Sequence, residues 1–187
     1  EKADPFNQIF PIPDFKNIPN EKGELPKLEQ RLNPDGSVFY ETYNFSDGTN
    51  DDRWYHWCVD NWGTKWDISV NQIECSLSGE TEKISIVDSE EFKGLKHINF
   101  WFESAWSAPI SAYNALLLKK PNLKLTATYY EKGSWFCGVY KNGVDDYKDE
   151  IPSSDDAYWE TNNGKLLIEW TGLLDEIIDD EENEIVE

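Results

Sequence analysis

Acidic side chains on predicted strands have the most direct catalytic potential in this sequence. Glu103 and Glu131 fall on predicted strands, and Glu74 and His97 fall on two others. Paired carboxylates act as general acid and base in many hydrolases. Strand positions alone do not fix the separation of these groups, so a small hydrolase-like enzyme remains an alternative. With His56 the chain has two histidines, too few to indicate a triad or a metal site.

Carboxylates are densest near the C-terminus. Their spacing matches neither the twelve-residue calcium loop nor a fixed two-carboxylate pattern, so we predict no metal and no cofactor. A solvated surface and a surface that binds a basic partner protein are both consistent with these clusters. The predicted partner-binding residues are Asp145, Asp146, Asp149, Glu150, Asp155, Asp156, Asp175, Glu176, Asp179, Asp180, Glu181 and Glu182.

The overall charge restricts the class of partner. The chain has 187 residues, with 37 acidic and 17 basic side chains and a net charge of -20. Direct nucleic-acid binding and attachment to an anionic membrane surface both need a basic face, so neither is expected. Residues 1–144 carry -6, whereas residues 145–187 carry -14. The excess charge is therefore concentrated in the last quarter of the sequence.

Cysteine content and hydropathy indicate the compartment. Three cysteines, Cys58, Cys75 and Cys137, do not form a disulfide framework, and we expect reduced, mostly buried thiols. No apolar run approaches the roughly 20 residues of a membrane-spanning helix. The sequence therefore predicts a cytoplasmic protein.

Short elements must position these residues. The spacing of Trp54, Trp57 and Cys58 predicts a helix over 51–62, capped by Thr49 or Asn50 and ended by Gly63. Alternating apolar residues predict strands elsewhere. We expect strands at 68–77, 83–87, 96–103, 123–131 and 135–141, the last of them closed by 142–143, helices at 107–120 and 165–180, a turn at 33–36, a polar loop at 145–164 and an extended Pro-rich stretch at 1–35.

This order of elements predicts an α+β domain, an antiparallel sheet with helices packed on one face, followed by an acidic C-terminal helix. Two tryptophan-rich stretches, 54–67 and 102–109, lie in this domain together with residues 130–138. With the Phe-Pro-Ile-Pro element at 10–13, they resemble a family of small phage- and plasmid-encoded proteins that includes a protein of an aphid-endosymbiont bacteriophage. The resemblance covers about residues 6–143.

The resemblance implies a ferredoxin-like domain at 1–143, with an acidic loop and C-terminal helix at 144–187. Members of the family usually begin with a strand bearing Trp-Cys-x-Asn and a helix, which this chain lacks. Two alternatives follow: the chain was trimmed at its N-terminus, or another segment, such as residues 38–45, fills the place of that strand. The family contributes no catalytic residues, so none is transferred.

The motif within these stretches favours a structural role. We expect Gly63 to cap the helix, Trp62 and Trp66 to fill the layer between helix and sheet, and Thr64 or Asp67 to accept from a buried indole N–H. A recognition loop built on Lys65 and the two tryptophans is the alternative. The motif residues are Asn61, Trp62, Gly63, Thr64, Lys65, Trp66, Asp67, Trp106, Ser107 and Pro109.

The sequence as a whole favours a non-enzymatic phage or mobile-element accessory protein. It would bind and inhibit a basic host protein, involved in defence or nucleic-acid processing, through an acidic surface that imitates nucleic acid. The place of action would be the cytoplasm of the bacterial host. A carbohydrate- or ligand-binding module is a further alternative, and it requires exposed rings among Trp62, Trp66, Trp101 and Trp135.

Overall fold

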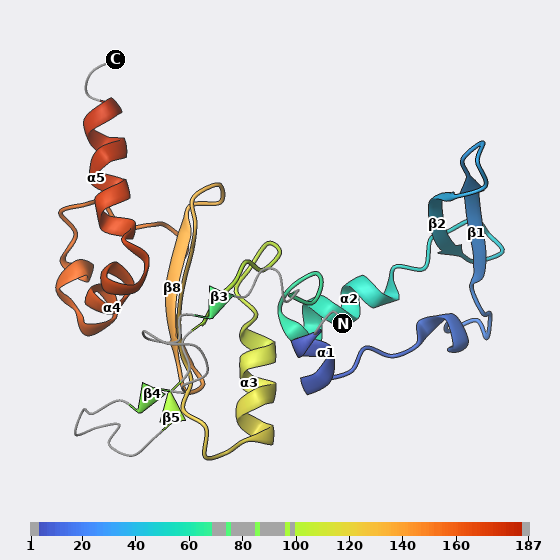
Figure 1. The fold of residues 1–187 in the computed structure, drawn as a ribbon, viewed down its shortest axis with the longest axis horizontal. Coiled ribbons are helices and arrows are strands. Elements are labelled where there is room, and N and C mark those ends of the chain that lie inside the picture. The colour runs from blue at the N-terminus through green and yellow to red at the C-terminus, as the bar shows by residue number, and fades with distance from the viewer. Residues whose placement is uncertain (1–3, 69–73, 76–84, 87–95, 98–99, 185–187) are drawn as a thin grey trace. The chain divides into compact units, whose positions relative to one another are not determined.

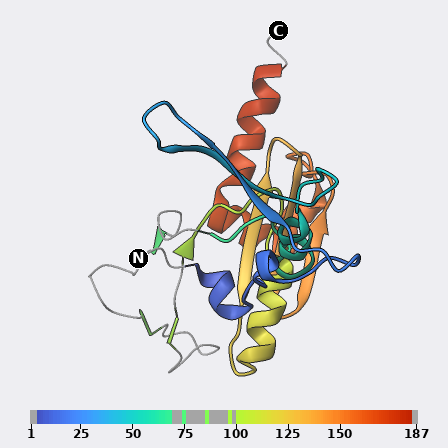
Figure 2. The same cartoon turned by 90° about the vertical axis from the view of Figure 1, so that its right-hand side faces the viewer.

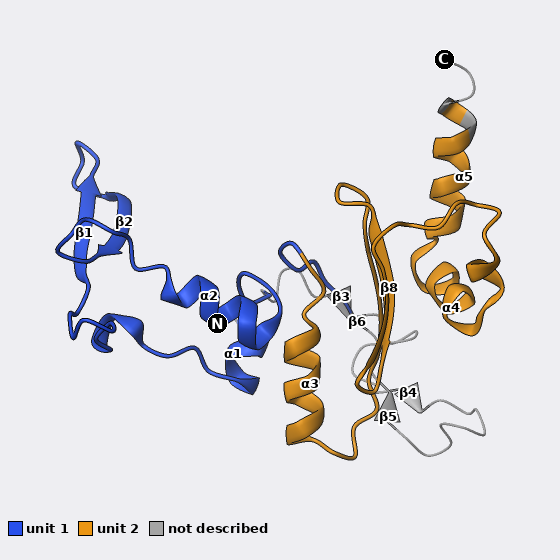
Figure 3. Ribbon diagram, turned by 180° about the vertical axis from the view of Figure 1, so that it is seen from behind, with its two compact units in different colours: residues 1–106 blue, residues 107–187 orange. Residues whose placement is uncertain are grey.

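The computed structural model describes residues 4–68, 74–75, 85–86, 96–97 and 100–184. The chain forms two compact units, residues 1–106 and residues 107–187 (Figure 3). Each combines helices with small antiparallel sheets, so the fold is mixed α and β, as predicted in its coarse form. The predicted domain boundary after residue 143 falls inside the second unit, at the turn between two paired strands.

Unit 1 contains short helices and two-stranded sheets (Figure 1). Strand β1 pairs with β2, β3 with β6, and β4 with β5, all antiparallel. Most of the predicted strands at 68–77 and 83–87 lies outside the described residues, whereas the one at 96–103 contains β5 and β6, which pair with different strands. The elements are α1 (Pro5–Ile9), η1 (Phe15–Asn17), β1 (Lys27–Leu32), β2 (Val38–Asn44), α2 (Arg53–Trp62), β3 (Glu74–Cys75), β4 (Ser85–Ile86), β5 (Lys96–His97) and β6 (Phe100–Trp101).

The predicted helix is confirmed as α2, but its buried face differs from the predicted one: Cys58 is buried as expected, Trp54 is exposed, and Trp62 is buried instead. Gly63 ends the helix in the left-handed conformation, with φ of 79°, and its N–H donates to the Val59 carbonyl. The predicted N-cap was wrong: Asp52 occupies that position, and its side chain makes no capping hydrogen bond.

The β1–β2 hairpin confirms the predicted turn, since Gly36 has a φ of 85° and donates to the Asn33 carbonyl (Figure 2). Its strands are exposed along most of their length. The segment expected to act as a sheet strand at 38–45 does form β2. Within the described residues, however, its only strand partner is β1.

Unit 2 is built around a three-stranded antiparallel sheet in the order β7-β8-β9. Helix α3 precedes the sheet, and α4 and α5 follow it. The elements are α3 (Ile110–Lys119), β7 (Thr126–Glu131), β8 (Phe136–Lys141), β9 (Val144–Lys148), η3 (Ala157–Glu160), α4 (Asn162–Thr171) and α5 (Leu173–Glu184).

A single apolar cluster forms the core of unit 2. Strand β8 contributes two residues that are almost completely buried, and α4 and α5 contribute three more. Burial of this apolar area is the main favourable term in folding. The cluster comprises Cys137, Val139, Ile151, Trp159, Leu167, Leu173 and Ile177.

Two predictions for the C-terminal quarter were wrong. Residues 145–164 do not form a loop, because they contain most of β9, all of η3 and the start of α4. The single helix expected at 165–180 is divided at Gly172, whose φ of 70° ends α4. Thr161 caps α4 through its hydroxyl, which accepts from the Gly164 N–H at 3.0 Å.

Gly164 permits a very close approach between α4 and the preceding turn. A Cβ atom at this position would lie 2.1 Å from the Tyr158 carbonyl oxygen. That oxygen belongs to the backbone, so a rotamer change cannot relieve the contact.

Helix length and cysteine burial bear on membrane insertion and on thiol chemistry. Over the described residues, no helix has both the length and the apolar character needed to cross a membrane. Cys58 and Cys137 are buried free thiols, and burial raises the pKa of each to about 11. Thiols that hold their protons at neutral pH are poor nucleophiles, so these two serve packing.

Candidate functional site

The motif at 61–67 connects several segments of unit 1. Trp62 is buried, as predicted, and its indole N–H donates to the Phe10 carbonyl at 2.9 Å. The predicted acceptors, Thr64 and Asp67, bind other groups instead. Asn61 stays within its own helix, where its side-chain amide donates to the Trp57 carbonyl at 2.9 Å.

Thr64 and Asp67 each fix a distant piece of chain. The buried Thr64 hydroxyl donates to the Ala105 carbonyl at 2.8 Å. The Asp67 carboxylate accepts from the backbone N–H groups of Phe6 and Asn7, at 2.9 and 2.7 Å. Burial raises the pKa of Asp67, and those two hydrogen bonds oppose the rise.

Lys65 lies against two indole rings. Its ammonium nitrogen is 4.6 Å from the centre of the Trp66 ring and 5.2 Å from that of Trp106. Both rings are accessible, with 48% of Trp66 and 72% of Trp106 exposed. The prediction that Trp66 fills an internal layer was therefore wrong. Trp106 has a φ of 74°, a strained conformation for a bulky side chain.

The rest of the motif belongs to unit 2. Ser107 precedes helix α3, whose N-cap position is held by Pro109 without a side-chain capping bond. Pro109 is buried.

A shallow cleft of about 220 Å³ lies beside the motif in unit 1. Three tryptophans from helix α2 and the motif line it, together with polar residues at the N-terminus of the described chain. The lining residues are Asp4, Asn7, Ile12, Trp54, Cys58, Trp62, Trp66 and Asp67.

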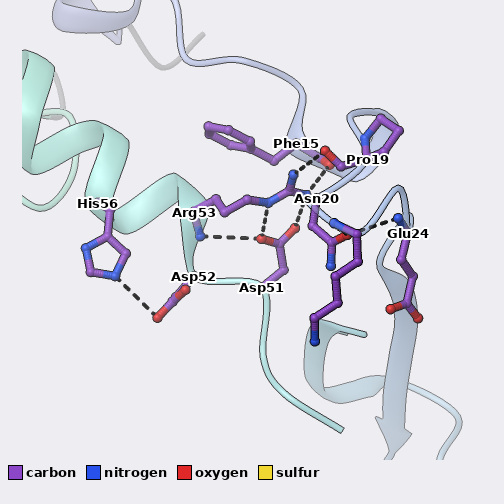
Figure 4. A network of polar contacts seen from close by, with 9 residues as sticks. Phe15, Pro19, Asn20, Glu24, Asp51, Asp52, Arg53 and His56 are labelled. Carbon is purple, nitrogen blue, oxygen red and sulfur yellow. Dashed lines mark hydrogen bonds and ion pairs between the residues drawn. The ribbon is translucent and has the colours of Figure 1, made fainter. Parts of the chain in front are cut away.

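Arg53 makes a network that the sequence did not reveal (Figure 4). Its guanidinium binds the buried carboxylate of Asp51 through two hydrogen bonds of 2.7 and 2.8 Å. It also donates to the carbonyls of Phe15 and Pro19, at 2.9 and 3.1 Å. The one local feature of the sequence that could have indicated this ion pair is Asp51, two residues before Arg53 at the start of helix α2. The fork is occupied by the protein's own groups, so it does not form an anion site.

Many of the predicted partner-binding carboxylates are engaged within unit 2. Asp146 binds Lys148 at 2.7 Å and Asn163 at 2.8 Å, and Asp180 binds Lys132 at 2.6 Å. The remaining engaged carboxylates accept mainly from hydroxyl or backbone groups. They are Asp145 from Tyr129, Asp155 from Ser153, Asp156 from Tyr158, Glu176 from Tyr130 and Lys132, and Glu181 from Ser154.

Four of the predicted partner-binding acids are not engaged in this way. Asp149, Glu150, Asp175 and Asp179 are exposed, and no ion pair or hydrogen bond of their side chains occurs among the described residues. The side chain of Glu182 lies outside the described part of the structure. We call these four of the predicted carboxylates the available acidic set.

The structural division also redistributes the charge. Unit 1 has 20 acidic and 10 basic residues, and unit 2 has 17 and 7, so each carries a net -10. The strongly acidic quarter shares unit 2 with five lysines, Lys119, Lys120, Lys124, Lys132 and Lys141. Among the described residues, no group of three or more His, Cys, Asp or Glu side chains could hold a metal ion.

The groups considered for a hydrolase are distributed over several elements. Glu74 lies opposite Trp101 in the β3–β6 pair, and His97 lies opposite Ser85 in the β4–β5 pair. Glu103 belongs to unit 1, and Glu131 belongs to unit 2, where it accepts from the Gly133 N–H at 2.7 Å. No catalytic pair is assembled by the described contacts.

The chain was compared with protein-family models, curated proteins and solved structures, and none of them matches. The resemblance to phage- and plasmid-encoded proteins is therefore still a prediction.

Proposed function

We propose that this chain is a non-enzymatic protein that binds a basic partner protein through the acidic surface of unit 2. The observation that carries this proposal is the available acidic set, Asp149, Glu150, Asp175 and Asp179. These side chains are exposed and lack a basic partner among the described residues, although other carboxylates of unit 2 are paired with Lys132, Lys148 and Lys165.

Unpaired carboxylates favour association with a basic surface for an electrostatic reason. Complementary potentials increase the rate of encounter and disfavour acidic competitors. Salt screens this attraction, with a Debye length of about 8 Å at physiological ionic strength. A partner bound in this way should therefore dissociate as the salt concentration rises.

The finer parts of the proposal depend on the family resemblance. They are a ferredoxin-like arrangement of residues 1–143, an acidic C-terminal helix, and an origin in a phage or other mobile element. With them we propose inhibition of a host defence or nucleic-acid-processing protein in the bacterial cytoplasm, by a surface that imitates nucleic acid. Competition between this chain and duplex DNA for the same partner would support imitation.

The experiment compares two variants with the same change of charge. The first neutralises the available set through Asp149→Asn, Glu150→Gln, Asp175→Asn and Asp179→Asn. The matched control neutralises four exposed acids of unit 1 through Glu21→Gln, Glu29→Gln, Asp60→Asn and Glu103→Gln. Partners retained from bacterial lysate by immobilised chain are identified, purified and titrated at about 0.05 M and about 0.5 M salt.

We expect the first variant to weaken binding at low salt by about tenfold or more, because four complementary charges are lost. The control should retain most of its affinity. Equal affinities of the two variants for the purified partner, or binding that is independent of salt, would refute the proposal.

A further inference from the structure

The cleft of unit 1 is bordered by two accessible indoles. Trp54 projects from helix α2, and Trp66 belongs to the motif. About half of Trp66 and more than a third of Trp54 is exposed. Lys65 packs over the Trp66 ring, and no ion pair of the described residues involves its ammonium group. This cation–π contact helps hold the ring at the edge of the cleft.

The chain's own N-terminal segment shows what the adjoining aromatic surface binds. Residues 10–13 read Phe-Pro-Ile-Pro, and the Phe10 carbonyl accepts from the Trp62 indole N–H at 2.9 Å. The Phe10 ring packs against Trp57, with their centres 5.1 Å apart. Indole N–H groups and aromatic rings recognise extended proline-containing segments in the same way, because such segments leave their carbonyls unpaired.

The cleft continues this surface beyond the bound segment. Ile12 lies on its border, and Trp62 lines it while bonding to Phe10. Asn7 stands at the rim, where its side-chain oxygen accepts from the Ile12 N–H at 2.8 Å. No hydrogen bond of the described residues uses the Asn7 amide nitrogen, so it can donate to a ligand carbonyl.

The volume of the cleft restricts the type of ligand. Pockets for whole small molecules usually exceed about 300 Å³, whereas this cleft has about 220 Å³. A space of that size suits one or two side chains of a segment that continues along the surface.

We propose that this cleft binds an extended, proline-containing segment of a partner protein, with proline rings against Trp54 and Trp66. Asn7 would bind a carbonyl of that segment. The site lies in unit 1 and uses no carboxylate of the available acidic set, so it can stand or fail separately from the function proposed above.

The test uses the full chain and a polyproline peptide of about ten residues as the probe. The indole N–H signals are followed by nuclear magnetic resonance and assigned with single Trp→Phe variants. We expect the peptide to shift the signals of Trp54 and Trp66 and to leave those of Trp135 and Trp170 unchanged. A Gly-Ser peptide of equal length should shift none of them.

Two tryptophans with nearly equal exposed fractions, Trp66 and Trp170, provide a matched pair of variants. Trp66→Ala should weaken the peptide affinity about tenfold or more, whereas Trp170→Ala, at a ring 46% exposed in unit 2, should not change it. The absence of a shift at Trp54 and Trp66, or equal shifts at Trp170, would overturn the proposal. It would also be overturned if cellohexaose shifted these two signals and polyproline did not, because the cleft would then be a saccharide site.

Discussion

The two units are stabilised in different ways. In unit 2, seven buried apolar side chains form one cluster; five come from β8, α4 and α5, and the other two are Ile151 and Trp159 of η3. In the described part of unit 1, the buried set includes Asp51 and Thr64, and Arg53, Trp62 and Asp67 bind segments far away in the sequence. Apolar burial dominates one unit, and a few directed polar contacts organise the other. The comparison therefore predicts different sensitivities to mutation.

The largest effect should follow from removing a core side chain of unit 2. Leu167 is completely buried, and Leu167→Ala should destabilise the unit by about 3 kcal/mol, because apolar contacts are lost and a cavity remains. Urea denaturation, with hydrogen exchange of the β8 amides, measures the loss. Leu118→Ala is the control, since Leu118 is 84% exposed. Similar losses in both variants would contradict the assigned core.

In unit 1, the charge-conserving substitution Arg53→Lys should reduce stability nearly as much. Arg53→Lys keeps the positive charge but cannot make the paired bonds to Asp51 together with those to Phe15 and Pro19. We expect a loss of about 2 kcal/mol, measured from hydrogen exchange of the α2 amides. Arg31→Lys, on the exposed hairpin, should have little effect. If the Arg53 variant is equally stable, directed contacts do not organise this unit.

The dependence on pH should distinguish the ion pair from packing. Hydrogen bonds from Arg53 lower the pKa of Asp51, so the ionised carboxylate stabilises the fold above its unfolded pKa of about 3.9. This contribution is lost as pH falls through the lower folded value. The stability advantage over Asp51→Asn, measured by urea denaturation, should therefore be present at pH 7 and shrink as pH falls below about 3.9. An advantage that is constant with pH would exclude the ionic explanation.

The smallest effect concerns a single hydroxyl. Thr64→Val removes the donor to the Ala105 carbonyl and should cost unit 1 about 1 kcal/mol. Thr64→Ser keeps the hydroxyl and should leave the amides near residue 105 better protected from exchange than Thr64→Val. Equal protection in the two variants would mean that the methyl group, and not the hydrogen bond, determines stability at this position.

Local patterns in the sequence predicted part of this fold. Helix α2 followed from its apolar spacing and Gly63, and β7 and β8 followed from alternation. Asn142 and Gly143, with φ of 49° and 95°, were interpreted as the end of a strand. They form the two-residue turn into β9, a strand whose acidic residues concealed its alternation.

The site was harder to predict because its contacts join distant residues. The bond from Trp62 to Phe10 spans 52 positions, and the bond from Arg53 to Phe15 spans 38. Nothing in the local sequence indicates such partners. Trp66 was expected inside because tryptophan is mostly buried, yet its contact with Lys65 allows the ring to remain accessible.

Gly164 has an evolutionary consequence. A side chain at this position would collide with the Tyr158 carbonyl, so selection should eliminate almost every substitution there. Thr161 makes the helix cap three residues earlier, and Asp156 caps the preceding 3-10 turn. Related sequences can therefore differ at most surface positions, while a glycine is expected at the position of Gly164. Position 164 therefore offers a criterion by which distant relatives could be recognised.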